Sequence, residues 1–189
     1  MNHRPQPRTH RHAPARRQAG VSLVESLLVM AITAVTLGAV LPGMGTALER
    51  RHLEGAAAQL ETDVMFTRSL AVAGNRTLRM SFQHDAGGSC YVVHTGSAGA
   101  CSCASGSSGA TCTDGAAALR SVRFASDAPL QVRANVGSMA FDPTRGTNTP
   151  TATLRLLGRD AQAVHLVVNL MGRVRACSPN AAVIGYRAC

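Results

Sequence analysis

The sequence predicts an α+β protein in which a long, partly transmembrane N-terminal helix packs against a C-terminal antiparallel β-domain. Three observations support this prediction. An uncharged apolar stretch runs from Ser26 to Leu48. Apolar residues then recur at helical spacing up to residue 74. Beyond residue 75 apolar and polar residues alternate as they do in strands, and no strand–helix–strand rhythm appears.

The first twenty residues carry more than half of the net charge of +9. They contain five arginines, no acidic residue, three histidines and three prolines. Without apolar periodicity this segment cannot bury a core, and we expect it to be disordered. It suits either a basic arm for nucleic acid or a short cytoplasmic leader, and the apolar stretch that follows favours the leader.

The stretch Ser26–Leu48 is long enough to cross a bilayer, since about 20 apolar residues span the hydrocarbon core. A buried helix of a soluble protein is the alternative. The basic flank favours a membrane segment with a cytoplasmic N-terminus. A secretory cleavage site would follow the apolar stretch, whereas here the small residues Ala19 and Gly20 precede it. Glu25 either marks the membrane edge or has a function, because a carboxylate inside a membrane is costly.

The segment Gly20-Val21-Ser22-Leu23-Val24-Glu25, between a basic leader and an apolar helix, resembles the signal of type IV prepilins and type II secretion pseudopilins. The resemblance implies that a membrane-bound prepilin peptidase cleaves between Gly20 and Val21 and N-methylates Val21. Val21 stands where the family most often has Phe. Glu25 becomes the fifth mature residue, and its carboxylate can pair with the α-ammonium group of a neighbouring subunit during assembly.

Two further stretches resemble the FimT/GspH group of minor pilins and pseudopilins. One is the amphipathic run after residue 46, which ends at Gly74-Asn75 as a C-cap would and repeats Leu53, Ala57, Leu60, Val64 and Ala71 at helical spacing. The other is the C-terminal string from Asn169 to Cys177. The resemblance implies four segments: a cleaved leader (1–20), a transmembrane half-helix (21–48), an amphipathic periplasmic half-helix (49–74) and a pilin-like β-domain (75–189).

Six segments of the β-domain alternate well enough to be strands: Thr77–Gln83, Tyr91–Thr95, Leu119–Phe124, Leu130–Ala134, Thr153–Leu157 and Val164–Leu170. Gly, Pro and Asn separate them. Residues 96–118 are rich in Gly, Ser and Ala, and we expect a loop that is mobile unless disulfides hold it.

All six cysteines follow the apolar stretch, which places them in the periplasm, where disulfides form. Cys177 and Cys189 enclose a short terminal loop, and we expect them to be bonded. Cys90, Cys101, Cys103 and Cys112 allow three pairings, of which one with Cys101–Cys103 is disfavoured because so small a ring is strained. Zinc is the rival interpretation, but the spacing lacks a CxxC pair and a histidine in register.

No arrangement of Ser, His, Asp or Cys along the sequence argues for catalysis, and no glycine-rich loop of the kind that cradles phosphates follows a strand. The chain is therefore predicted to have no enzymatic activity, cofactor or metal. Residues 120–189 contain nine arginines against three acidic residues, so an anionic partner is expected to contact this region.

Arg173 and Arg175 follow Gly172 and, on a strand, would lie on one face about 6.6 Å apart. Arg187 lies in the loop that a Cys177–Cys189 bond would hold nearby. In FimT-like minor pilins a Gly-Arg-x-Arg motif is associated with DNA binding in natural transformation. Arg173 and Arg175 match that motif, whereas Arg187 is added from proximity alone. The alternative is a solvated strand face, or pairing with acidic residues of another pilin.

The sequence thus predicts an inner-membrane protein, with its β-domain in the periplasm, that later enters a pilus or pseudopilus. Expected partners are prepilin peptidase, other pilins or pseudopilins, the inner membrane and double-stranded DNA. With 3% aromatic residues, DNA would be bound through phosphates and without sequence preference. The leading function is that of a FimT-type minor pilin, and the alternative is a GspH-type minor pseudopilin with a structural role in type II secretion.

Overall fold

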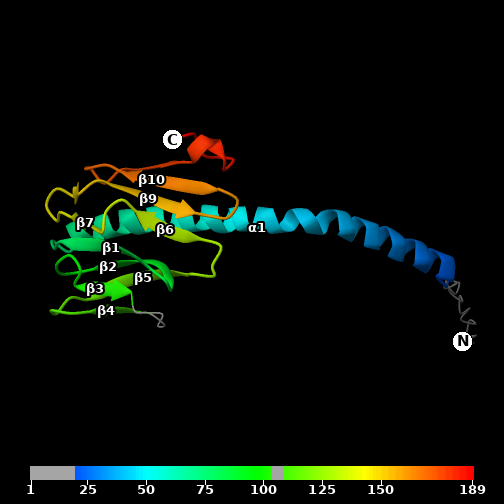
Figure 1. The fold of residues 1–189 in the computed structure, drawn as a ribbon, viewed down its shortest axis with the longest axis horizontal. Helices are drawn as coiled ribbons and strands as arrows, with labels where there is room; N and C mark the ends of the chain where they lie inside the picture. Colours follow the sequence, from blue (N-terminus) through cyan, green and yellow to red (C-terminus); the bar gives the residue numbers. More distant parts are fainter. Residues whose placement is uncertain (1–19, 104–108) are drawn as a thin grey trace, which may run out of the picture. The chain divides into compact units, whose positions relative to one another are not determined.

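The computed structural model describes residues 20–103 and 109–189 (Figure 1). The predicted leader, except Gly20, lies outside the described residues, as does the middle of the 96–118 segment. The described elements, in chain order, are α1 (Leu23–Ala73), β1 (Leu78–Asp85), β2 (Gly88–His94), β3 (Cys101–Cys103), β4 (Ala110–Cys112), β5 (Ala118–Ala125), β6 (Gln131–Ala134), β7 (Ser138–Phe141), β8 (Asn148–Thr149), β9 (Ala152–Leu157), β10 (Ala163–Val168), β11 (Val174–Cys177) and the 3-10 helix η1 (Pro179–Ala181).

The chain divides into two compact units, Met1–Pro42 and Gly43–Cys189. The described part of the first unit consists of residues 20–22 and the beginning of α1, and its large apolar side chains, from Val21 to Leu37, are exposed. Within the described part of the chain, no helix meets the length and hydropathy required to traverse a membrane. The second unit contains the rest of α1 and all the described strands.

In the second unit α1 contributes one apolar face to the core. The prediction for this face is confirmed, because its five residues are at most 1% exposed: Leu53, Ala57, Leu60, Val64 and Ala71. Spacings of four and three residues keep them on one side of the helix. The helix ends as predicted: the Gly74 N–H donates to Leu70 O (2.9 Å), and Asn75 adopts a positive φ of 44°.

Two antiparallel sheets cover this helix face. The first sheet has the strand order β5-β2-β1-β7-β8 and the second has β11-β10-β9-β6. Alternate residues of both sheets point into one shared core, which includes Met80, Tyr91, Leu154, Leu166 and Val174. The expected fold class, one long helix with an antiparallel β-domain, is confirmed.

A buried acid joins α1 to the first sheet. Asp63, 1% exposed, accepts a hydrogen bond from Tyr91 Oη of β2 (2.7 Å) on the same carboxylate oxygen that receives Arg120 Nε of β5 (2.8 Å). Burial, followed by the hydrogen bond to Asp63, raises the pKa of Tyr91 far above its ordinary value. The phenol is therefore a hydrogen-bond donor throughout the physiological pH range.

Each of the six predicted strands corresponds to an observed one, namely β1, β2, β5, β6, β9 and β10. The prediction of a loop over residues 96–118 is wrong in part, because β3 and β4 form a hairpin there. Three more strands were not predicted: β7, β8 and β11. They are two to four residues long, too short for alternation to be evident.

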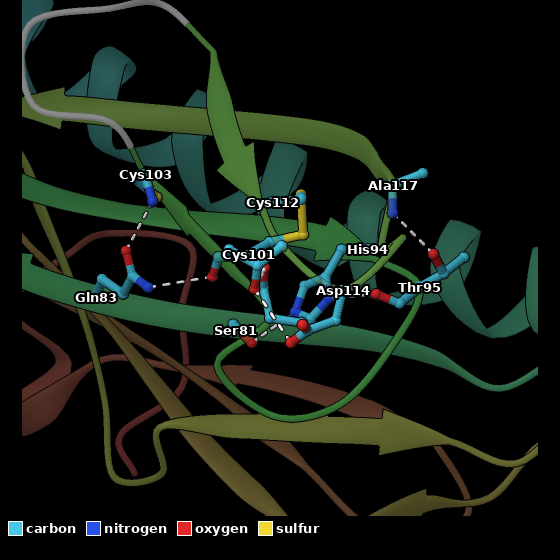
Figure 2. The surroundings of a disulfide bond; sticks show 11 residues. Ser81, Gln83, His94, Thr95, Cys101, Cys103, Cys112, Asp114 and Ala117 are labelled. Carbon is cyan, nitrogen blue, oxygen red and sulfur yellow. Dashed lines mark hydrogen bonds between the residues drawn. A yellow bond between two sulfur atoms is a disulfide. The ribbon is translucent and has the colours of Figure 1, made fainter.

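The hairpin of β3 and β4 lies on the outer face of the first sheet and is joined to it covalently. Cys90 of β2 is bonded to Cys103, and Cys101 is bonded to Cys112 across the hairpin. This is one of the two pairings left open after the disfavoured one. In Figure 2, Gln83 of β1 reaches the backbone of the hairpin: its Nε2 donates to Cys101 O (3.3 Å), and its Oε1 accepts from Cys103 N (2.7 Å). The cysteines and Val92 form a second small core.

Candidate nucleic-acid interface and processing motif

The residues of the predicted cleavage site lie immediately before α1. Gly20 and Val21 are exposed and non-helical, and Leu23 begins the helix. Ser22 Oγ accepts a hydrogen bond from the backbone N–H of Glu25 (3.2 Å), so Ser22 caps the helix. Ser-x-x-Glu is the residue pattern of a capping box, and Glu25 also places its negative charge in the first turn. The bond between Gly20 and Val21 is thus outside the helix and accessible.

The turn between β10 and β11 positions the Gly-Arg-x-Arg motif. Asn169 fixes it, because its Oδ1 accepts from Arg173 N (2.9 Å) and its backbone O accepts from Gly172 N (2.9 Å). Gly172 has a φ of +72°, and a Cβ there would lie 2.8 Å from Arg68 Cδ. Arg68, on α1, donates from Nε to Gly146 O (2.7 Å). Glycine is therefore required at 172 for both its backbone conformation and its contact with α1.

Arg173 and Arg175 point to solvent on either side of buried Val174. This alternation places both guanidinium groups on the outer face of the second sheet. β11 begins at Val174 and pairs with β10 from there, so Arg173 immediately precedes the strand and Arg175 lies within it.

Arg187 lies at the opposite end of β11 from Arg173. Its backbone O accepts a hydrogen bond from Ser178 N (2.8 Å), and Ala188 forms a bridge with Ser178. Cys177 is bonded to Cys189, the pair expected from the sequence. Since five residues of strand cover about 16 Å, Arg187 lies well away from Arg173 along β11.

The outer face of the second sheet carries two further exposed arginines, Arg133 of β6 and Arg155 of β9. They are directly opposite each other in the antiparallel register, and His165 of β10 is opposite Arg155 on the other side. Arg133 also donates from a terminal nitrogen to His84 Nε2 of β1 (3.0 Å). The four strands of this sheet contain no Asp or Glu.

His165, on the same face, has a lowered pKa. Partial burial, followed by the charge of Arg155, lowers its pKa below the ordinary value. Cys189 Sγ lies 3.7 Å from Nδ1 of the same ring. The imidazole is therefore neutral at pH 7, and the arginines provide the charge.

Sequence reasoning missed the roles of four residues, Ser22 at the processing motif and Arg68, Arg133 and Arg155 around the second sheet. Ser22 could have been recognised from the Ser-x-x-Glu spacing before an apolar run. Arg133 and Arg155 meet through a strand pairing between segments about twenty residues apart, for which the sequence gives no register. Arg68 contacts Gly172 only in the folded chain.

Apart from the charged arginines, the described residues present few groups that could bind a metal or take part in a reaction. Among the described residues, no group of three His, Cys, Asp or Glu side chains is placed to hold a metal. The buried His94 receives a hydrogen bond at Nε2 from Ser81 (2.8 Å), and Nδ1 donates to the backbone O of Thr95 (2.8 Å), as Figure 2 shows. Both ring nitrogens are thus occupied by hydrogen bonds to β1 and to the residue that follows β2.

Comparison with known protein families shows which family this chain belongs to. The profile of the family described as Type II transport protein GspH matches residues 56–172, from the amphipathic half of α1 to the turn before Arg173. The chain belongs to the GspH family. A second profile, the prokaryotic N-terminal methylation motif, matches residues 15–41 of this GspH-family chain and includes Gly20, Val21 and Glu25. No curated protein matches the chain.

Solved structures similar to this GspH-family chain include two from secretion and pilus systems. The Pseudomonas aeruginosa type IV minor pilin FimU is 23% identical, with a TM-score of 0.48 over 69% of this chain and 95% of that one. The minor pseudopilin EpsH of the Vibrio cholerae type 2 secretion system is 12% identical, with a TM-score of 0.42 over 67% and 97%.

Proposed function

We propose that this chain is a minor pilin of a type IV pilus with a structural, non-catalytic role. Prepilin peptidase cleaves it between Gly20 and Val21 and methylates Val21. Residues 21–48 hold it in the inner membrane, with the β-domain in the periplasm, until it assembles into the pilus or at its tip. The methylation motif and the exposed bond ahead of α1 support the processing step. The exposed apolar side chains at the beginning of α1 suit a lipid or helical partner.

Within the pilus the proposed ligand is double-stranded DNA, bound through Arg173 and Arg175. One observation carries this part: two exposed guanidinium groups flank a buried valine on a rigid turn fixed by Asn169 and Gly172. Guanidinium groups bind phosphates in a bidentate manner. Since the described strands of this face carry no exposed aromatic ring for base stacking, binding should be independent of sequence and strongly dependent on salt.

The second candidate is a minor pseudopilin of a type II secretion system with a role in assembly. The specific observation that favours it is the family itself, whose description is a type II transport protein. In that case Arg173 and Arg175 contact acidic residues of another pseudopilin, and the chain does not bind DNA.

DNA titration separates the two candidates. The processed full chain, purified in a non-ionic detergent after co-expression with a prepilin peptidase, is titrated with a random-sequence duplex at low and at physiological salt. The minor-pilin proposal predicts binding at low salt that Arg173→Ala/Arg175→Ala removes. Equal binding by this variant, or no binding by the wild type, refutes the DNA-binding role. Mass spectrometry of the same material should find N-methylated Val21, whereas an intact Met1 would refute the processing step.

A further inference from the structure

The outer face of the second sheet presents an unusual arrangement of like charges. Arg133 and Arg155 are cross-strand partners, so their Cβ atoms are about 5 Å apart. Like charges directly opposite each other on a sheet destabilise it. No ion pair to either arginine is found in the described part of the chain, and the sheet strands contain no acidic residue. A bound anion would remove this repulsion.

The position of Arg133 is fixed by two contacts from outside its own sheet. His84 of β1 accepts a hydrogen bond from its guanidinium group (3.0 Å), which aims the side chain. The neighbouring Val132 N–H donates to Ser89 Oγ of β2 (2.8 Å), which fixes the backbone of β6. Arg133 is therefore held in place although it is exposed, so less conformational entropy is lost when it binds a ligand.

The two pairs of arginines lie on one continuous face. Arg175 is opposite Val167 of β10, and Val167 is opposite Thr153 of β9, two residues from Arg155. The residues between the pairs, Val167, Thr153 and the neutral His165, are uncharged or small. From β6 to β11 there are three strand spacings, about 14 Å in total, which equals the rise of about four nucleotides of one DNA strand along the helix axis.

We propose that Arg133, Arg155, Arg173 and Arg175 form one arginine track across the second sheet, which binds the phosphate backbone of duplex DNA. This inference rests on the proposed DNA-binding function and extends it from the β10–β11 turn to β6 and β9. The track recognises the row of phosphates rather than the bases. His84 acts as a positioning residue for Arg133.

The test compares three double variants of the processed full chain in non-ionic detergent, titrated with a random-sequence duplex over a series of salt concentrations. Arg133→Gln/Arg155→Gln removes the new half of the track, and Arg173→Ala/Arg175→Ala removes the motif. Arg51→Gln/Arg76→Gln removes the same charge from exposed sites on or just after α1 and is the matched control. Urea midpoints no lower than that of the wild type establish that the variants are folded.

The track predicts that Arg133→Gln/Arg155→Gln weakens binding about tenfold at low salt and reduces the slope of log K against log salt by about 2. The control variant should leave the slope unchanged. His84→Phe, which cannot accept the hydrogen bond, should reproduce a part of the loss of DNA binding. His84→Gln, which can accept it, should bind DNA like the wild type.

Three outcomes would overturn the track. If only the motif variant loses binding, DNA is held at the turn alone and the proposed function survives without the extension. If the control variant reduces the slope of log K against log salt as much as Arg133→Gln/Arg155→Gln (the β6–β9 variant) does, only the net charge of the chain matters. If the β6–β9 variant binds DNA normally but no longer binds vesicles of phosphatidylglycerol, the face is a membrane surface. Absence of binding by the wild type would instead refute the proposed function itself.

Discussion

The outer faces of the two sheets differ completely, although both sheets bury their inner faces in the same core. The first sheet is covered by the β3–β4 hairpin, which buries Cys90 and Val92 and accounts for two of the three disulfides. The outer face of the second sheet is open and carries only positively charged and neutral side chains. A covered face contributes stability, whereas an open, charged face is available for a ligand. In the proposed function, stability and recognition are thus assigned to different sheets.

The largest effect should follow from opening the covered face. Cys90→Ala/Cys103→Ala releases the hairpin from β2 and should lower the free energy of unfolding by about 3 kcal/mol. Urea unfolding of residues 43–189 measures this, after a cooperative transition has been established for the wild type. DNA binding at 25 °C should be unchanged. A loss of DNA binding in a folded variant would mean that the two faces are not independent.

The same substitution on the two outer faces should have very different costs. Val92 of the first sheet is 1% exposed and Val167 of the second is 41% exposed. Val92→Ala should destabilise by about 2 kcal/mol, because it removes two buried methyl groups and leaves a cavity. Val167→Ala should change stability by less than about 0.5 kcal/mol. Equal urea midpoints for the two variants would contradict the distinction between a covered and an open face.

A smaller effect concerns the bond between α1 and the first sheet. Tyr91→Phe removes the hydrogen bond to Asp63 and should cost about 1 kcal/mol, since Arg120 still pairs with the carboxylate. The wild type should also lose stability as pH rises above 10, because the unfolded tyrosine then ionises whereas the raised pKa keeps the folded one protonated. Urea midpoints from pH 8 to 11 should show this loss, and the Phe variant should lack the Tyr91 part of it.

The smallest expected effect is a pH dependence of the open face. Partial burial and the charge of Arg155 lower the pKa of His165. The imidazole ring also contacts the Cys177–Cys189 disulfide. Protonation adds a positive charge in the middle of the track, so DNA affinity should rise as pH falls below 6.5, and His165→Gln should reduce that rise. The readout is the difference between the two pH profiles, and identical profiles would exclude His165 from the interface.

Much of the fold could be predicted because it follows from periodicity. Five core residues of α1, its end at Gly74-Asn75 and six strands have strong local patterns. The β3–β4 hairpin could not be predicted, since its Gly- and Ser-rich sequence has little strand propensity and disulfides hold it in place. In the candidate site, the alternation around Val174 was evident from the sequence. The meeting of Arg133 and Arg155 depends on a register between two non-consecutive strands, and no local pattern determines that.

The contact between Arg68 and the two turns has a mechanical consequence. Arg68 donates to Gly146 O, and its side chain also packs against Gly172, so a single residue of α1 supports the turn that presents Arg173. A pull on a ligand held by that turn would reach the helix directly through this packing contact, and the helix is the element by which a pilin is built into its fibre in the proposed function. Tension on captured DNA would then be shared between α1 and the second sheet.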